Sequence, residues 1–137
     1  MRIDVPNDAS SDCIRVGGVD EQETLYAMMH MLSCFSLGKD VGVAAFSVAL
    51  QAFSRHMQSQ DLVVSVSPLG ERVADTPMDT DTDRSHQYFF TMTFLDRSQC
   101  DRAYAYILKS RNAPENPHHA VMSHVGEDAV FICWRDL

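Results

Sequence analysis

The stretch "QYFFTMTFLD", residues 87–96, decides the fold because it contains a strand and the start of a helix. Side chains of a strand alternate between the two faces of a sheet. Apolar side chains dominate on both faces here, with Tyr88, Phe90, Met92 and Phe94 on one and Phe89, Thr91, Thr93 and Leu95 on the other. We therefore expect both faces of this strand to be covered.

A helix is predicted directly after this strand, over residues 97–110. Asp96 is a suitable N-cap, and Gln99 three residues later completes the pattern of a capping box. Lys109 lies near the other end, where a positive charge favours the helix dipole. The helix is expected to bury its apolar stripe, which consists of Cys100, Ala103, Tyr104, Ile107 and Leu108.

Upstream segments complete the set of predicted elements. Residues 24–35 alternate as a strand, in which His30 shares a face with Leu32, and Met31 shares the other face with Ser33. Residues 43–60 have a helical period and place Phe46, Leu50, Phe53 and Met57 on one side. Residues 61–73 alternate as a second strand that ends or bulges at Pro68, and residues 129–136 form the last strand.

The order of these elements is βαββαβ, which predicts an α+β, ferredoxin-like fold. In this fold a four-stranded antiparallel sheet carries two main helices on one face. The first and third strands are apolar on their other face as well, and an uncovered patch of that size promotes aggregation. A second copy of the sheet would cover the patch. We therefore expect a homodimer, arranged as a dimeric α/β barrel.

Length and charge limit the remaining possibilities. The chain has 137 residues, which suits a single domain at residues 23–137 preceded by a flexible polar extension at residues 1–22. A net charge of −8 disfavours nucleic acid and anionic membrane surfaces as partners. No apolar run approaches the roughly 20 residues of a membrane span. Scattered cysteines and an N-terminus without a secretory h-region predict a cytoplasmic protein.

An acidic segment separates the second and third strands. Its aspartates resemble a calcium loop, but the central glycine and closing glutamate of an EF-hand are missing. We expect residues 75–85 to form a mobile loop that folding does not require, because the segment has almost no apolar anchor.

The tail "NPHHAVMSHVGEDAVFICWRDL", residues 116–137, holds His118, His119 and His124, and three interpretations of it stay open. A metal site is disfavoured because neighbouring histidines diverge and no HEXXH motif occurs, so no metal or other cofactor is expected. An acid/base site would use the near-neutral pKa of histidine. A structural corner would use the histidines as hydrogen-bonding groups and pair Arg135 with Asp136.

The acid/base interpretation assigns specific roles. His30 and one of the tail histidines would reach a single cavity between sheet and helices, and Arg135 would orient a carboxylate or an enolate. The candidate catalytic residues are therefore His30, His119 and Arg135. The candidate ligand-binding residues are Tyr26, Tyr88, His118 and Trp134.

The tail also resembles a known signature. "HHAV-S-V" followed by "F-x-x-W-R-D" is similar to the C-terminal pattern of an uncharacterised family of short bacterial proteins of the dimeric α/β-barrel type. The matching positions are His118, His119, Ala120, Val121, Ser123, Phe131, Trp134, Arg135 and Asp136. The resemblance implies the same dimeric fold and a bacterial origin. Related barrels use such cavities for cofactor-free oxygenation, isomerisation or decarboxylation of small cyclic compounds.

Three functions follow as alternatives. The chain binds a small organic molecule in a cavity between sheet and helices, or it is a cofactor-free monooxygenase, isomerase or decarboxylase that uses histidine chemistry. The third alternative is a non-catalytic dimerisation module. An open cavity would favour the first two, and a filled interior would favour the third.

Overall fold

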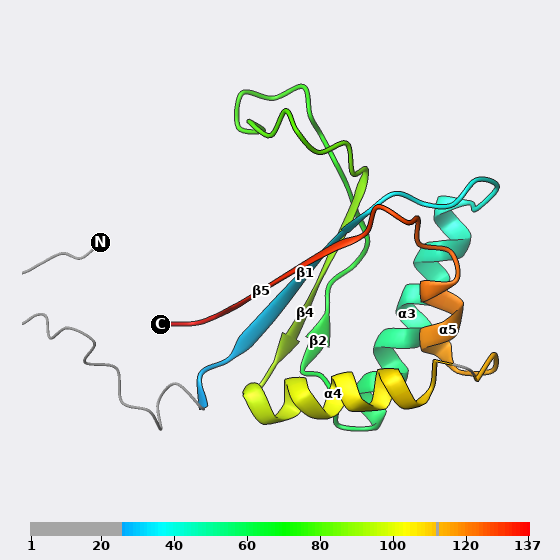
Figure 1. Ribbon diagram of the computed structural model, residues 1–137, viewed down its shortest axis with the longest axis vertical. Helices are drawn as coiled ribbons and strands as arrows, with labels where there is room; N and C mark the ends of the chain where they lie inside the picture. Colours follow the sequence, from blue (N-terminus) through cyan, green and yellow to red (C-terminus); the bar gives the residue numbers. More distant parts are fainter. Residues whose placement is uncertain (1–25, 112) are drawn as a thin grey trace, which may run out of the picture.

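The computed structural model describes residues 26–111 and 113–137. The expected extension at residues 1–22 lies outside the described residues. The elements follow one another as β1 (Met29–Phe35), α3 (Val43–Ser59), β2 (Ser65–Val66), β3 (Gly70–Glu71), β4 (Tyr88–Phe94), α4 (Arg97–Lys109), α5 (Pro117–Met122) and β5 (Val130–Arg135). Figure 1 shows the helices gathered on one side of the strands.

The strands form one antiparallel sheet in the order β2-β4-β1-β5, with β3 also paired to β4. This order and the βαββαβ sequence of elements confirm the predicted ferredoxin-like fold. The sheet has five strands rather than four because the predicted second strand is divided at Pro68, which has no N–H to donate. Beside the break, the Ser67 hydroxyl accepts the Thr91 N–H at 2.8 Å. The tail adds a third helix, α5.

The inner face of the sheet, which the helices cover, carries the core. The register places Met31 between Met92 and Cys133, and Ser33 between Phe90 and Phe131. The predicted stripe of α3 is confirmed, because Phe46, Leu50, Phe53 and Met57 are all buried. These four side chains fill the space between α3 and the sheet.

The outer face is the opposite side of the sheet, and no described helix covers it. The register assigns to it His30, Leu32, Cys34, Phe89, Thr91, Thr93, Val130, Ile132 and Trp134. Ile132 is 44% exposed and Trp134 46% exposed. The structure thus confirms that β1 and β4 carry apolar side chains on both faces, and it leaves one of these faces open.

The capping box of α4 is confirmed. The Asp96 carboxylate accepts the Gln99 N–H at 2.8 Å, and the Gln99 side chain accepts the Leu95 N–H at 2.7 Å. The first turn also docks on the preceding connection, because the Gln99 side chain and Arg102 both donate to the Asp61 carbonyl. These contacts fix the N-terminal half of α4 against the end of β4.

Two predictions about burial are wrong. Tyr104 and Leu108 were expected in the core, but they are 63% and 40% exposed. The helix buries Gln99 and Ala103 instead, while Tyr106 and Ile107 in its second half are partly buried against the core. Tyr26 precedes β1 instead of lying within it and is 66% exposed.

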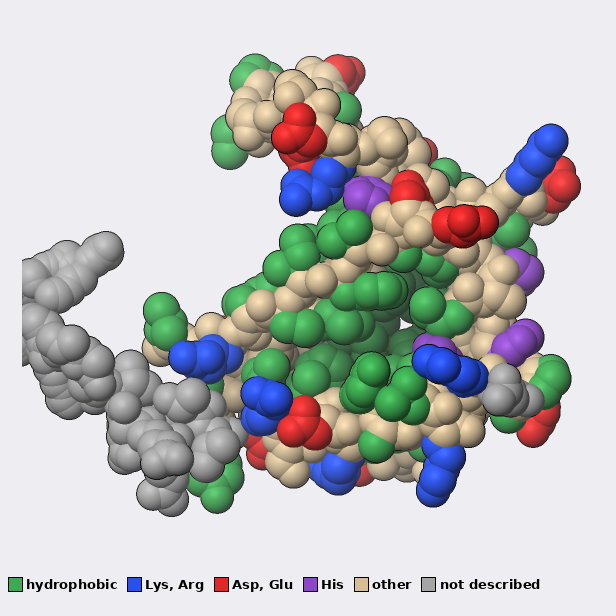
Figure 2. Space-filling model, viewed as in Figure 1, with side chains coloured by type: hydrophobic (Ala, Val, Ile, Leu, Met, Phe, Trp, Pro, Cys, Tyr) green, Lys and Arg blue, Asp and Glu red, His purple; other side chains and the backbone are tan. Residues whose placement is uncertain are grey.

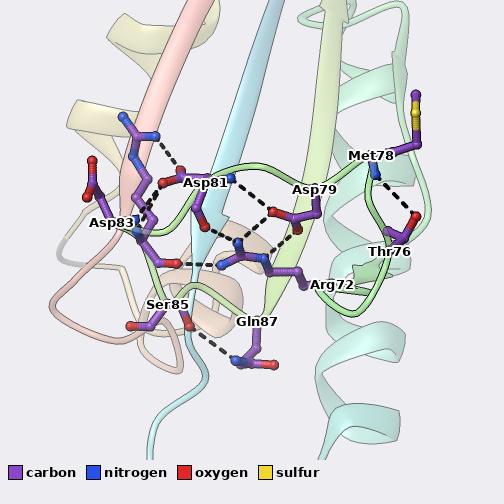
Figure 3. Close-up of polar contacts among 9 residues, drawn as sticks. Arg72, Thr76, Met78, Asp79, Asp81, Asp83, Ser85 and Gln87 are labelled. Carbon is purple, nitrogen blue, oxygen red and sulfur yellow. Dashed lines mark hydrogen bonds and ion pairs between the residues drawn. The ribbon is translucent and has the colours of Figure 1, made fainter.

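The acidic loop between β3 and β4 has a polar centre rather than an apolar one (Figure 3). Both ends of the Arg72 guanidinium donate to Asp79, each at 2.8 Å, and a further bond reaches the Asp81 carbonyl at 2.7 Å. The hydrogen bonds from Arg72 hold the pKa of Asp79 below its usual range. This network gives the loop an anchor that the expectation of a mobile segment did not include.

We expect Arg72→Gln to loosen this loop and leave the rest of the domain folded, because the bidentate contact to Asp79 is lost. Hydrogen–deuterium exchange of peptides covering residues 73–87 should speed up, with little change in the melting temperature. Arg84→Gln is the matched control, since Arg84 is more exposed and pairs with Asp81 rather than Asp79. Equal exchange in the parent and the Arg72 variant would contradict the assigned anchor.

Candidate functional site

A cavity of about 500 Å³ lies between the inner face of the sheet and helices α4 and α5. Figure 2 shows it as a hollow lined by hydrophobic side chains. Met31, Phe90 and Met92 line it from the sheet, and Tyr104, Ile107 and Leu108 line it from α4. Its volume and apolar walls are those of pockets that hold small organic molecules. On the side of α4, the cavity opens where Tyr104 and Leu108 stay exposed.

One end of the cavity is formed by α5, which Asn116 positions. The Asn116 side chain accepts the His118 N–H at 2.8 Å and donates to the Tyr106 hydroxyl at 2.9 Å. The same hydroxyl is hydrogen-bonded to His56. Pro117 suits the first turn, where no N–H is needed. The cap and the tyrosine together fix α5 to α3 and α4, so that His118 and His119 line the cavity.

Two buried polar atoms at this cavity have no hydrogen-bond partner among the described residues. They are the Ser33 hydroxyl oxygen and the Nδ1 atom of His118. Ser33 is 0% exposed, and both residues line the cavity. Buried polar atoms are nearly always hydrogen-bonded, since leaving one unpaired costs about 1–3 kcal/mol. A bound molecule that carries a hydroxyl or a carbonyl would satisfy these atoms once the side chains that cover them shift slightly.

His118 is a neutral imidazole at neutral pH. Its burial lowers the pKa, and the neighbouring His119 lowers it further. The ring lies against Phe53, with 5.8 Å between centroids. A neutral imidazole has one nitrogen that donates and one that accepts a hydrogen bond. His118 can therefore bind a polar group of a ligand or accept a proton from it.

The lowered pKa predicts a loss of stability in mild acid. Below the unfolded-state pKa of about 6.5 the unfolded chain binds a proton that the folded chain resists, so the free energy of unfolding decreases as the pH falls. We expect the melting temperature of His118→Asn to fall less than that of the parent between pH 7.5 and pH 5. Exposed His124→Asn is the control and should follow the parent. Parallel curves for all three proteins would refute the prediction.

His30 lies outside the cavity, contrary to the expectation. Side chains alternate between the two faces along β1, so His30 lies on the outer face while Met31 and Ser33 lie on the inner face. Its Nε2 atom is 2.8 Å from the Asp136 carboxylate and its Nδ1 atom is 3.1 Å from the Thr93 hydroxyl. Trp134 stacks on the ring at 5.1 Å. The predicted grouping of His30 with the tail histidines is therefore wrong.

The other predicted site residues are also dispersed. Arg135 is exposed opposite Met29 and does not line the cavity. Its expected ion pair with Asp136 does not occur in the described residues, where Asp136 pairs with His30. Tyr88 packs on Phe35 in the core, and Tyr26 lies beside the start of α4. Only His118 and His119 of the predicted set lie at the cavity.

Sequence reasoning missed Ser33 and Arg111, which also line the cavity. For Arg111 a signal existed, because Tyr104, Ile107, Leu108 and Arg111 follow one another at helical spacing. Ser33 gave no signal, since a serine in an apolar strand is common. Within the described residues, no group of three or more histidine, cysteine or carboxylate side chains converges as a metal site would require. No described helix has the length and apolar character needed to cross a membrane.

Solved structures share this fold at low sequence identity. A variant of SnoaB, a cofactor-independent oxygenase from Streptomyces nogalater, aligns over 79% of this chain and 91% of its own, with 14% identity and a TM-score of 0.51. The protein At3g17210 from Arabidopsis thaliana aligns over 80% and 95%, with 11% identity and a TM-score of 0.59. Hydroxynitrile lyase from Passiflora edulis aligns over 82% and 95%, with 10% identity and a TM-score of 0.51. No protein-family model matches the chain, and no curated protein matches it significantly.

Proposed function

We propose that the chain binds a small organic molecule in the cavity between the sheet and helices α4 and α5. The observation that carries this proposal is the pair of unpartnered polar atoms, on Ser33 and His118, at one apolar cavity. An apolar cavity with a few convergent polar groups is the usual form of a ligand site. A filled interior would have favoured a non-catalytic dimerisation module, and the volume of about 500 Å³ argues against it.

A cofactor-free enzyme is the second candidate, and the neutral His118 favours it. A general base must be unprotonated at the working pH and must reach the proton that it removes. His118 meets the first condition, and its place on the cavity wall brings a bound molecule within reach. An oxygenase and a lyase share the fold, which makes catalysis on it chemically reasonable without assigning a reaction. Of the other residues expected to be catalytic, His119 lines the cavity and stays a proposed catalytic residue, whereas His30 and Arg135 lie outside it.

The homodimer is likewise proposed, on the evidence of the outer face. Ile132 and Trp134 are both more than two-fifths exposed on it, beside Leu32 and Phe89. A second copy related by a two-fold axis would bury this face against itself. A single domain at residues 23–137, membership of the bacterial family with the HHAV signature and a cytoplasmic location belong to the same proposal.

Ligand binding is tested by a thermal-shift screen of small aromatic and alicyclic alcohols, ketones and acids. Hits should raise the melting temperature of the parent, because a ligand that binds only the folded state stabilises it. Ser33→Ala should weaken the hits roughly three- to tenfold by removing one hydrogen bond. His30→Asn, on the outer face, is the matched control and should bind like the parent. Equal affinity of the hits for Ser33→Ala and for the parent would show that the ligands bind at another site.

A further inference from the structure

Helix α4 presents a continuous stripe to the cavity. Tyr104, Ile107, Leu108 and Arg111 all line it, and their spacing places them along one side of the helix and the turn that follows. Tyr104 and Leu108 remain substantially exposed, so this side is not packed against the sheet. An apolar helix face turned to an open cavity can form one wall around an apolar ligand. The stripe ends in a guanidinium.

Arg111 is the single arginine among the cavity-lining residues of the described chain, and no aspartate or glutamate lines the cavity with it. Arg111 forms no ion pair with a carboxylate of the described residues, whereas Arg72 and Arg97 each pair with an aspartate. Its exposure places it at the open edge of the cavity, which we call the mouth. Figure 2 shows basic and histidine side chains at one end of the hollow.

Recognition at the two ends of the cavity differs in chemistry. The mouth offers a permanent positive charge whose planar donors match a carboxylate. The interior offers the Ser33 hydroxyl and the neutral His118 ring, which suit an uncharged hydroxyl or carbonyl. Between them the walls are aromatic and aliphatic, and they exclude a second charged group because its desolvation would not be compensated.

We propose that the ligand is an amphipathic carboxylate. Its aromatic or alicyclic ring occupies the cavity, its carboxylate binds Arg111 at the mouth, and a hydroxyl or carbonyl on the ring bonds to Ser33 and His118. This proposal rests on the proposed function of the cavity as a ligand site. It goes further by naming the charge and the polarity of the ligand and the residue that selects the charge.

The experiment compares two probes of nearly equal shape, 6-hydroxy-2-naphthoate and 6-hydroxy-2-naphthamide, by calorimetric titration at pH 7.5. The parent should bind the carboxylate about tenfold more tightly than the amide, as a charge-assisted contact predicts. Arg111→Gln should abolish this preference and leave the affinity for the amide unchanged. Lys109→Gln is the matched control, because Lys109 is exposed on the same helix and does not line the cavity.

The possible results separate the two proposals. If the parent binds both probes equally, or if Arg111→Gln keeps the preference, the carboxylate assignment is overturned and the cavity stands as a ligand site. If the parent binds neither probe, the proposed function fails and the assignment fails with it. Loss of the preference in both Arg111→Gln and Lys109→Gln would show a diffuse effect of charge, which also overturns the role of Arg111.

Discussion

Replacing Ile132 by lysine should convert the proposed homodimer into a monomer. Ile132 is 44% exposed on the outer face, next to Leu32 on β1. In a two-fold dimer each substitution acts twice, so two ammonium groups would be buried in the apolar interface. Burying an unpaired charge costs several kcal/mol, so we expect the dissociation constant to rise by about a thousandfold or more. Light scattering at micromolar concentration should show the mass of one chain for the variant and of two for the parent.

Val48→Lys is the control for this experiment. Val48 is 63% exposed on α3, on the other side of the molecule from the outer face, and the change in charge is the same. This variant should remain dimeric. A parent protein that is monomeric and soluble at micromolar concentration would contradict the face-to-face arrangement. If Ile132→Lys remains dimeric, the interface lies on another surface of the protein.

The strands and their faces were predictable because alternation is a local property of the chain. Phe90 and Met92 point inward and Phe89 points outward, as the stretch at residues 87–96 predicts. The helical stripe from Phe46 to Met57 was predictable for the same reason. Pro68 was expected to end the second strand or to mark an edge or a bulge. In the structure the two short strands β2 and β3 both pair with β4. This result depends on how the chain resumes pairing after the proline, which the proline alone does not determine.

The cavity was harder to predict because it arises from the relative placement of elements. The apolar side of α4 has the pattern of a buried face, and nothing in that pattern shows that Tyr104 and Leu108 meet an opening instead of the sheet. The misplacement of His30 is a different case. Side chains alternate along β1, so the sequence already separates His30 from Ser33, and the structure shows that the face of His30 is the outer one. The unpartnered state of Ser33 depends on side chains from other elements, so no local pattern contains it.

Truncating Phe53 should destabilise the domain strongly and enlarge the cavity. Phe53 is 3% exposed and contacts both the core and the His118 ring. Loss of a buried phenyl ring costs about 3–5 kcal/mol, a large share of the roughly 5–15 kcal/mol that keeps a domain folded. At about 4 °C per kcal/mol, the melting temperature of Phe53→Ala should fall by roughly 12–20 °C at a fixed protein concentration.

Phe46→Ala is the control for this prediction, because it removes a phenyl ring from the core without changing the lining of the cavity. Phe46 is 0% exposed and packs on Phe35, but it does not line the cavity. Its truncation should cost as much stability as that of Phe53. The probe 1-naphthol meets an enlarged cavity in Phe53→Ala and the original cavity in Phe46→Ala, so it should raise the melting temperature of Phe53→Ala by several degrees more than that of Phe46→Ala. Equal recovery in the two variants would mean that the space left by Phe53 does not add to the space in which the probe binds.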